Sequence, residues 1–205
     1  MSRQTSYGQK QRLTPVDRFG VWLSMRRIRS TIGTGINKRI ADIGCGYHGR
    51  IGRLFAEEAE KLVLVDLSLS PELKDDSRIT AVEGRLPEAL SDLADGSLDI
   101  ILCNSVLEHL DRPLDTLKAF RRLLAPEGIA LINVPSWRGK WFLEFSAFRL
   151  GLSPAEEIND HKAYYDPKDL WPLLIEAGFK PSGITCFKHK FGLNTFAVCR
   201  TEPEI

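Results

Sequence analysis

A short glycine-rich segment, Asp42 to Gly49, holds the residue types that are most typical of a ligand-binding loop. Gly44, Gly46 and Gly49 follow the G-x-G-x-x-G spacing that lets a backbone approach a nucleotide closely. An acidic residue, Asp66, stands 20 positions after Gly46, where it could accept hydrogen bonds from ribose hydroxyls. The segment therefore predicts a ligand that contains a nucleoside.

The carboxylate of Asp42, two residues before the first glycine, bears on the charge of that ligand. A pyrophosphate binds to backbone amides and to the positive end of a helix, so a carboxylate in the same crevice would repel it. Two unit charges about 5 Å apart interact by about 3 kcal/mol at an effective dielectric of about 20. A ligand that carries an ammonium and a sulfonium would be attracted instead. The loop thus favours a cationic ligand.

Short apolar runs that alternate with helical patterns are expected to position this loop. Five predicted strands cover residues 39–44, 61–67, 79–84, 98–104 and 129–136. Helical patterns follow at 49–60, 111–128 and 166–179. Two β-rich segments, "GITCFKH" and "NTFAVCR", flank "KFGL" and fit an antiparallel hairpin. The pattern predicts an α/β fold: a doubly wound, Rossmann-like, seven-stranded and mostly parallel sheet with a C-terminal antiparallel hairpin.

Two helix starts can be predicted from capping residues. Asp111 stands where an N-cap belongs, with Pro113 in the first turn. Asp169 as the N-cap of the later helix would put Pro172 in a first turn, where its missing amide is not needed.

Ligands of open parallel sheets bind at the carboxyl ends of the strands, where the strand order reverses. This rule places one group of residues around a single crevice: Asp42–Gly46, Asp66, Gly84 and Asn104.

Two segments lie outside the alternation of strands and helices. Residues 1–37 form a basic arm with a predicted amphipathic helix at about 15–31, and residues 38–205 form the ligand-binding domain with an insertion at about 136–165. Residues 1–39 hold nine Lys and Arg residues and one acid, whereas the rest of the chain has a net charge of about −7. A basic arm on an acidic body indicates either a solvated face or a phosphate-rich or membrane-surface partner.

The cysteines and the hydropathy bear on location. The four cysteines match no zinc spacing, and Cys103 and Cys199 lie in apolar runs, where a thiol behaves as a small hydrophobe. No apolar run of 18 residues occurs, and the polar start of the chain lacks the pattern of a signal peptide. We therefore expect a cytoplasmic protein without a transmembrane segment, which could contact a membrane surface peripherally.

The order of these motifs resembles class I S-adenosylmethionine-dependent methyltransferases of the type 11 kind. "DIGCG" is similar to their first motif, "VDLS" to their ribose-binding acid and "VEGRLPEAL" to their adenine-side loop. The stretch from residue 96 to 136 resembles theirs through strands four and five, and the similarity covers roughly residues 38–200. It implies S-adenosyl-L-methionine as cofactor, S-adenosyl-L-homocysteine as product and methyl transfer by in-line displacement.

The resemblance also implies a role for each matching residue. Asp42 would face the methionine ammonium, the loop Gly44, Cys45 and Gly46 would approach the amino-acid portion, and Asp66 would accept from the ribose. The remaining contacts would be made by Leu67 beside the adenine, by Gly84, Arg85 and Leu86 along the adenine edge, and by Asn104 and Ser105 near the sulfonium. Many relatives carry an acid at the position of Arg85, so here the adenine would be recognised by backbone groups.

Methyl transfer needs alignment and exclusion of water more than a universal catalytic residue, although a hydroxyl acceptor also needs a base. His161, beside Asp160 near the end of the insertion, is our candidate for an acceptor-site base, with an exposed loop histidine as the alternative. The pair Glu108–His109 is similar to one in ubiquinone-pathway O-methyltransferases, where a further Glu three residues earlier resembles a metal site. Ser105 stands at that position here, so we expect no metal.

The insertion bears on the acceptor. It holds five aromatic residues within twelve positions, interleaved with cations, and predicts either an acceptor lid or an amphipathic helix that closes the domain. "MRRIRSTI" and "GLNTFAV" also resemble segments of methyltransferases encoded with cell-envelope polysaccharide synthesis. This implies a small-molecule acceptor, or a glycan or lipid-linked sugar, that is anionic or membrane-proximal. No base-methylation motif follows strand four, so a nucleic acid is not expected.

Two alternatives stay open. The glycine spacing by itself permits an NAD-dependent oxidoreductase. An intact cofactor loop is also compatible with a catalytically silent S-adenosylmethionine-binding partner protein.

Overall fold

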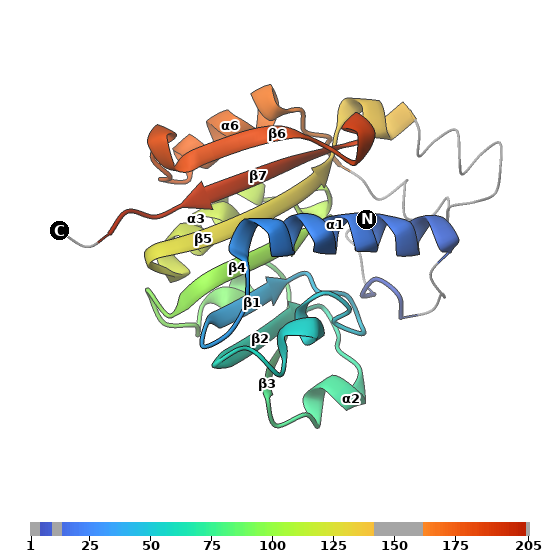
Figure 1. Cartoon of the computed structure of the whole chain (residues 1–205), viewed down its shortest axis with the longest axis vertical. Helices are drawn as coiled ribbons and strands as arrows, with labels where there is room; N and C mark the ends of the chain where they lie inside the picture. The colour runs from blue at the N-terminus through green and yellow to red at the C-terminus, as the bar shows by residue number, and fades with distance from the viewer. Residues whose placement is uncertain (1–4, 10–13, 142–161, 204–205) are drawn as a thin grey trace.

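A seven-stranded sheet forms the centre of the computed structural model, which describes residues 5–9, 14–141 and 162–203. The strand order is β3-β2-β1-β4-β5-β7-β6, with parallel pairing except where β7 lies antiparallel between β5 and β6 (Figure 1). The strands are β1 (Arg39–Ile43), β2 (Lys61–Asp66), β3 (Ile79–Glu83), β4 (Leu98–Asn104), β5 (Leu124–Pro135), β6 (Ile184–His189) and β7 (Asn194–Arg200). The predicted fold class and the C-terminal hairpin are confirmed.

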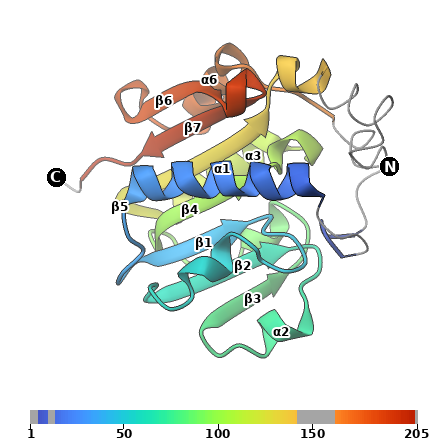
Figure 2. The same cartoon turned by 45° about the vertical axis from the view of Figure 1, so that its right-hand side comes forward.

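Helices cover both faces of the sheet because the central strands are apolar on both sides. Helix α1 (Pro15–Ile32) runs across one face, where Ile28 is fully buried in an apolar layer with β1, β2 and β4 (Figures 1 and 2). Helices α3 (Pro113–Leu123) and α6 (Pro167–Glu176) contribute to the other layer, through Phe120 and Leu170 among others. The short α2 (Pro71–Lys74) places Leu73 in the α1 layer. No helix among these described residues is long and apolar enough to cross a membrane.

The helix expected at 49–60 is only a four-residue 3-10 helix, Gly52–Phe55. A Cβ built on Gly52 would lie 2.4 Å from the Leu64 side chain, so the chain runs very close to the sheet here. The Gly52 amide donates to the Asp42 carboxylate at 2.8 Å, which ties this turn to β1. Because the chain packs so closely against the sheet, it does not form the amphipathic helix that the apolar spacing predicted.

Both predicted N-caps are wrong. Helix α3 has Arg112 at its N-cap position without a side-chain cap, and Asp111 instead pairs with Lys162. Helix α6 begins at Pro167 after the N-cap Asp166, and Asp169 completes a capping box from its third position. Pro172 therefore lies inside the helix, where it removes one backbone hydrogen bond. In both helices the first proline lies closer to the helix start than the acid that was predicted as the N-cap.

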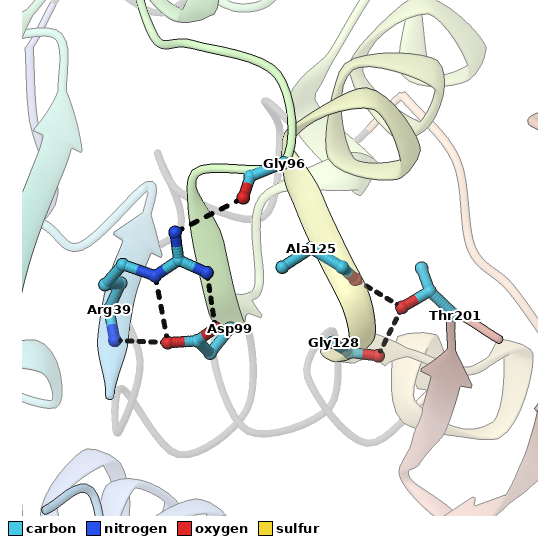
Figure 3. Close-up of polar contacts among 6 residues, drawn as sticks. All are labelled: Arg39, Gly96, Asp99, Ala125, Gly128 and Thr201. Carbon is cyan, nitrogen blue, oxygen red and sulfur yellow. Dashed lines mark hydrogen bonds and ion pairs between the residues drawn. The ribbon is translucent and has the colours of Figure 1, made fainter. Parts of the chain in front are cut away.

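Polar contacts connect the strand ends that lie opposite the carboxyl ends of β1 and β4 (Figure 3). Arg39 at the start of β1 forms a fork with Asp99 at the start of β4, with an Nη2–Oδ1 distance of 2.6 Å. The Arg39 guanidinium holds the pKa of Asp99 below its usual value. Thr201 after β7 donates from its hydroxyl to the Ala125 carbonyl at 2.6 Å. These contacts hold neighbouring strands in register, so the opposite ends of the strands meet at the same crevice.

Candidate active site

A cavity of about 1430 Å³ opens at the carboxyl ends of β1, β2 and β4. The structure places on its wall every residue expected to contact the cofactor: Asp42, Gly44, Cys45, Gly46, Asp66, Leu67, Gly84, Arg85, Leu86, Asn104 and Ser105. Their contacts with a ligand stay predictions, but the fold brings all eleven together. The cavity continues beyond them beneath α1 and the turn before β7.

The glycine loop fits tightly between β1 and the segment after β4. Gly44 has a φ of +76°, and a Cβ there would lie 2.2 Å from Val106 Cγ2. Gly46 has a φ of +75° and faces the Tyr7 carbonyl, 3.1 Å from a built Cβ. At both positions a left-handed backbone and a close neighbour require glycine.

Asp42 is a buried carboxylate on the cavity wall, with 2% of its surface exposed. Burial raises its pKa to about 7, and the nearby charge of Asp66 acts in the same direction. A cationic group in the cavity would favour the ionised form again. Asp42 also accepts the Gly52 amide at the start of the 3-10 helix. In its ionised form this carboxylate suits a cation better than a diphosphate.

Asp66 is held at the end of β2 by three donors. Its Oδ2 accepts from the Gly46 amide at 2.7 Å, and its Oδ1 accepts from the Leu67 amide at 2.8 Å and from the Ser6 hydroxyl at 2.5 Å. The Tyr47 amide donates to the Tyr7 carbonyl at 2.9 Å, so the segment around Ser6 closes over the glycine loop. Sequence reasoning missed Ser6, because it lies 60 residues before its partner with no motif around it.

Two residues after β4 complete the cofactor end of the cavity. Ser105 has a φ of +55°, and its amide donates to the Asn133 carbonyl at 2.8 Å. The side-chain oxygen and nitrogen of Asn104 are buried, and neither has a hydrogen-bond partner among the described residues. Buried amides are normally satisfied, so a ligand that pairs with Asn104 fits this position.

The acceptor end is built from elements that the sequence did not connect. Helix α1 contributes Val16, Phe19 and Gly20, and the turn between β6 and β7 contributes Lys190 and Phe191. Sequence analysis assigned α1 to a basic arm without a place in the site, because no local pattern shows against which strands a helix packs.

The candidate base and the expected absence of a metal both stay predictions. His161 lies outside the described residues, so its role stays a prediction. Glu108 is fully buried on the cavity wall, and its carbonyl accepts from the Lys162 amide at 2.7 Å. Among the described residues no group of three or more His, Cys, Asp or Glu side chains could hold a metal ion.

The described start of the insertion packs on the domain. Trp137 lies 5.6 Å from the Tyr164 ring, centroid to centroid, and donates from its indole nitrogen to Asp169 of α6 at 3.2 Å. Trp137 therefore packs on α6, whereas both predicted roles of the insertion, acceptor lid and closing helix, stay predictions. The aromatic residues from 142 onward lie outside the described residues.

The sequence matches a family described as "Methyltransferase domain" over residues 23–182. The chain belongs to this family. The resemblance to class I S-adenosylmethionine-dependent methyltransferases is thereby confirmed, and it replaces the alternative of a nicotinamide-dependent oxidoreductase. The narrower resemblance to enzymes of polysaccharide synthesis stays a prediction.

Curated relatives include ubiquinone biosynthesis O-methyltransferases. The protein from Vibrio campbellii is 22% identical over 157 residues, which are 72% of this chain and 66% of the relative. The protein from Escherichia coli O6:H1 is 23% identical over 184 residues, 85% of this chain and 75% of the relative. The chain thus spans slightly less than two thirds of the length of the Vibrio relative.

Solved structures share the fold of this methyltransferase domain. An S-adenosylmethionine-dependent methyltransferase from Archaeoglobus fulgidus has a TM-score of 0.64 at 18% identity, covering 88% of this chain and 94% of that one. The 1,6-didemethyltoxoflavin-N1-methyltransferase of Burkholderia thailandensis was crystallised with its substrate and S-adenosylhomocysteine. It has a TM-score of 0.60 at 19% identity and covers 95% of this chain and 93% of its own.

Proposed function

We propose that this protein binds S-adenosyl-L-methionine in the cavity and transfers its methyl group to a small-molecule acceptor. The observation that carries the proposal is Asp42, a buried carboxylate beside the glycine loop. A cationic group of the ligand would favour the ionised form of this carboxylate. The bound donor would supply a sulfonium-activated methyl group and would leave as S-adenosyl-L-homocysteine.

The residues of the chain would bind and orient the two reactants. Asp42 would attract the methionine ammonium. Asp66 would accept hydrogen bonds from ribose hydroxyls, either in addition to the one from the Ser6 hydroxyl or in its place. Asn104 would gain the hydrogen bonds that its buried amide lacks among the described residues. Helix α1 would shield the reacting atoms from water by covering the acceptor end. Alignment and exclusion of water account for much of the catalysis in such a reaction.

We further propose a glycan or lipid-linked sugar as the acceptor, taken from a membrane surface, with oxygen as the acceptor atom. The curated relatives are named as O-methyltransferases, which supports oxygen. Trp22 on α1 is 52% exposed, it stacks on Phe19 at 5.7 Å, and the Arg26 guanidinium lies 5.7 Å from its ring centre. Exposed aromatic rings with arginines are typical of surfaces that insert at a lipid interface.

Calorimetry with S-adenosylhomocysteine and NADH tests the cofactor. We expect one S-adenosylhomocysteine per chain and no heat with NADH. Asp42→Asn should weaken binding of S-adenosylhomocysteine at least tenfold, because the amide keeps the shape and the Gly52 contact but loses the charge. Asp75→Asn, at an exposed acid outside the cavity, should leave the affinity unchanged. Tight binding of NADH without binding of S-adenosylhomocysteine would contradict the proposal.

Turnover is tested with labelled methyl donor and fractionated cell extract. Label should enter a glycan or lipid-linked fraction. Binding of the donor without transfer to any fraction would support the alternative of a silent cofactor-binding partner.

A further inference from the structure

The turn between β6 and β7 has an unusual backbone at the acceptor end of the cavity. Lys190, Phe191 and Gly192 have φ values of +49°, +58° and +83°. A left-handed conformation is costly for a residue with a side chain, so two such residues in succession persist only where their surroundings hold them. Such strain is often found at functional sites.

The end of β5 holds this turn in place. Ser136 is fully buried; its amide donates to the Leu193 carbonyl at 3.0 Å and its hydroxyl to the Gly192 carbonyl at 2.8 Å. A Cβ on Gly139 would lie 2.0 Å from the Leu193 oxygen, so the helical segment after β5 lies directly against the turn. The position of Lys190 is therefore determined by the core of the domain.

The side chain of Lys190 lies on the cavity wall over α1. Its Nζ is 3.8 Å from a Cβ built on Gly20, an ordinary van der Waals distance, so the ammonium lies against α1 at this position. Burial lowers the pKa of Lys190 to about 8, and the carboxylate of Glu108 opposes that shift. Lys190 forms no ion pair or hydrogen bond through its ammonium with Glu108 or any other described residue.

A second cation lies beside the same turn. The Nη1 of Arg138 is 3.5 Å from a Cβ built on Gly192, and Arg138 also lines the cavity. No described residue forms an ion pair with it. Arg112 and Lys162, also on the wall, form ion pairs with acids: Arg112 with Glu88 and Asp115, and Lys162 with Asp111. The acids Asp17 and Glu108 line the cavity as well, and the charge of Glu108 acts on Lys190. Lys190 and Arg138 are thus two cations at this end that form no ion pair with a described residue.

Apolar groups also line this end. Val16 and Phe19 of α1 and Phe191 of the turn line the cavity here, and all three are partly exposed at its rim. A ligand that fits both properties has an apolar body and one anionic group.

We propose that Lys190 and Arg138 bind an oxyanion on the ligand of this end of the cavity, which makes the methyl acceptor an organic anion, such as a lipid-linked sugar that carries an acidic group. That this ligand is the methyl acceptor rests on the proposed function, whereas the binding of an organic anion does not. Lys190 and Arg138 would position the acceptor against the apolar wall, and they would take no part in the transfer of the methyl group.

Two fluorescent probes that differ by one group test the proposal. 8-Anilinonaphthalene-1-sulfonate and N-phenyl-1-naphthylamine share a ring system, but only the first carries an anion. With S-adenosylhomocysteine present, Lys190→Met should weaken the sulfonate at least tenfold and the neutral probe less than twofold. Arg138→Gln should weaken the sulfonate at least fivefold. Lys168→Met, at an exposed lysine outside the cavity, should change neither.

1-Naphthoate and 1-naphthyl phosphate then compete against the sulfonate, to distinguish a carboxylate from a phosphate ester. We expect at least one of the two competitors to displace the sulfonate from the wild type, and neither to displace it from Lys190→Met. An equal loss of both probes, or no loss of the sulfonate, in Lys190→Met would overturn the proposal. Failure of S-adenosylhomocysteine to bind the wild type would instead refute the proposed function, while the two probes would still report on the anion site in the free protein.

Discussion

Two carboxylates at the carboxyl ends of neighbouring strands lie in very different surroundings. Asp66 accepts three hydrogen bonds, from Gly46, Leu67 and Ser6, which hold its carboxylate in place at the end of β2. Asp42 accepts the Gly52 amide, and burial raises its pKa to about 7. The two acids are thus suited to different tasks, hydroxyl recognition for Asp66 and attraction of a cation for Asp42.

The raised pKa of Asp42 predicts a pH dependence of cofactor binding. The folded protein without ligand binds this proton up to about pH 7, whereas the unfolded chain loses it near the ordinary value of 3.8. The stability that protonated Asp42 contributes is therefore full below that ordinary value and is lost as the pH rises to 7. An ammonium beside Asp42 would expel the proton, so affinity for S-adenosylhomocysteine should rise about eightfold from pH 6 to pH 7.5.

Calorimetry at the two pH values measures this change. Asp42→Asn serves as the reference, because it keeps any titration of the ligand and of Asp66 but lacks the carboxylate at position 42. The Asn variant should bind weakly with a much flatter pH profile. A wild-type profile as flat as that of the variant would show that Asp42 does not titrate with binding.

Among the elements, the glycine loop and the segment after β4 depend on each other's shape. Gly44 donates its amide to the Val65 carbonyl at 2.8 Å, and the Val106 side chain fills the space next to its Cα. Together these contacts close the loop against the sheet and leave the cavity open on the other side.

Gly44→Ala should destabilise the protein by two separate effects. The left-handed backbone costs an alanine roughly 1 kcal/mol, and the clash with Val106 adds about 1–3 kcal/mol of overpacking. Gly96→Ala is the matched control, since Gly96 has a φ of +62° with nothing within 4 Å of its built Cβ. Urea denaturation should show a much larger loss of unfolding free energy for Gly44→Ala, and Val106→Ala should restore part of it. Equal losses at both glycines would mean that Val106 can move aside.

Across the whole molecule, α1 joins the basic arm to the domain that holds the cavity. Ile28 packs in the core, and Arg29 forms a two-pronged ion pair with Glu58, with an Nη1–Oε2 distance of 2.6 Å. The opposite side of the helix stays exposed at Phe19 and Trp22. One helix thus covers the cavity and presents aromatic and basic residues at the surface.

Trp22→Ser should reduce binding to vesicles that contain phosphatidylglycerol at least fivefold, because Trp22 is exposed and free to enter an interface. Its thermal stability should stay near that of the wild type. Trp171→Ser on α6, which packs on the other face of the sheet, should bind vesicles normally. Cosedimentation at low and high salt measures both effects, and equal binding by the three proteins would exclude α1 as the membrane contact.

Much of this protein could be predicted from its sequence, because the signals are local. Apolar runs of strand length, glycine spacing and an acid at the end of β2 led to the fold class and to a crevice at Asp42–Gly46, Asp66, Gly84 and Asn104. The resemblance to methyltransferases added the rest of the eleven residues that line the cavity. The errors were local too: the predicted helix at 49–60 and the caps at Asp111 and Asp169 failed where packing or an adjacent proline outweighed a weak propensity.

Only the tertiary structure decided which distant segments complete the site. Ser6 reaches Asp66 across 60 residues, and Lys190 lies over Gly20 from the far end of the chain. Neither pair leaves a periodicity or spacing in the sequence, because each depends on where α1 crosses the sheet and how the final hairpin turns. The sequence alone therefore determined the kind of ligand loop and its place at the strand ends, whereas the packing of α1 and the β6–β7 turn decided the shape and charge of the acceptor end.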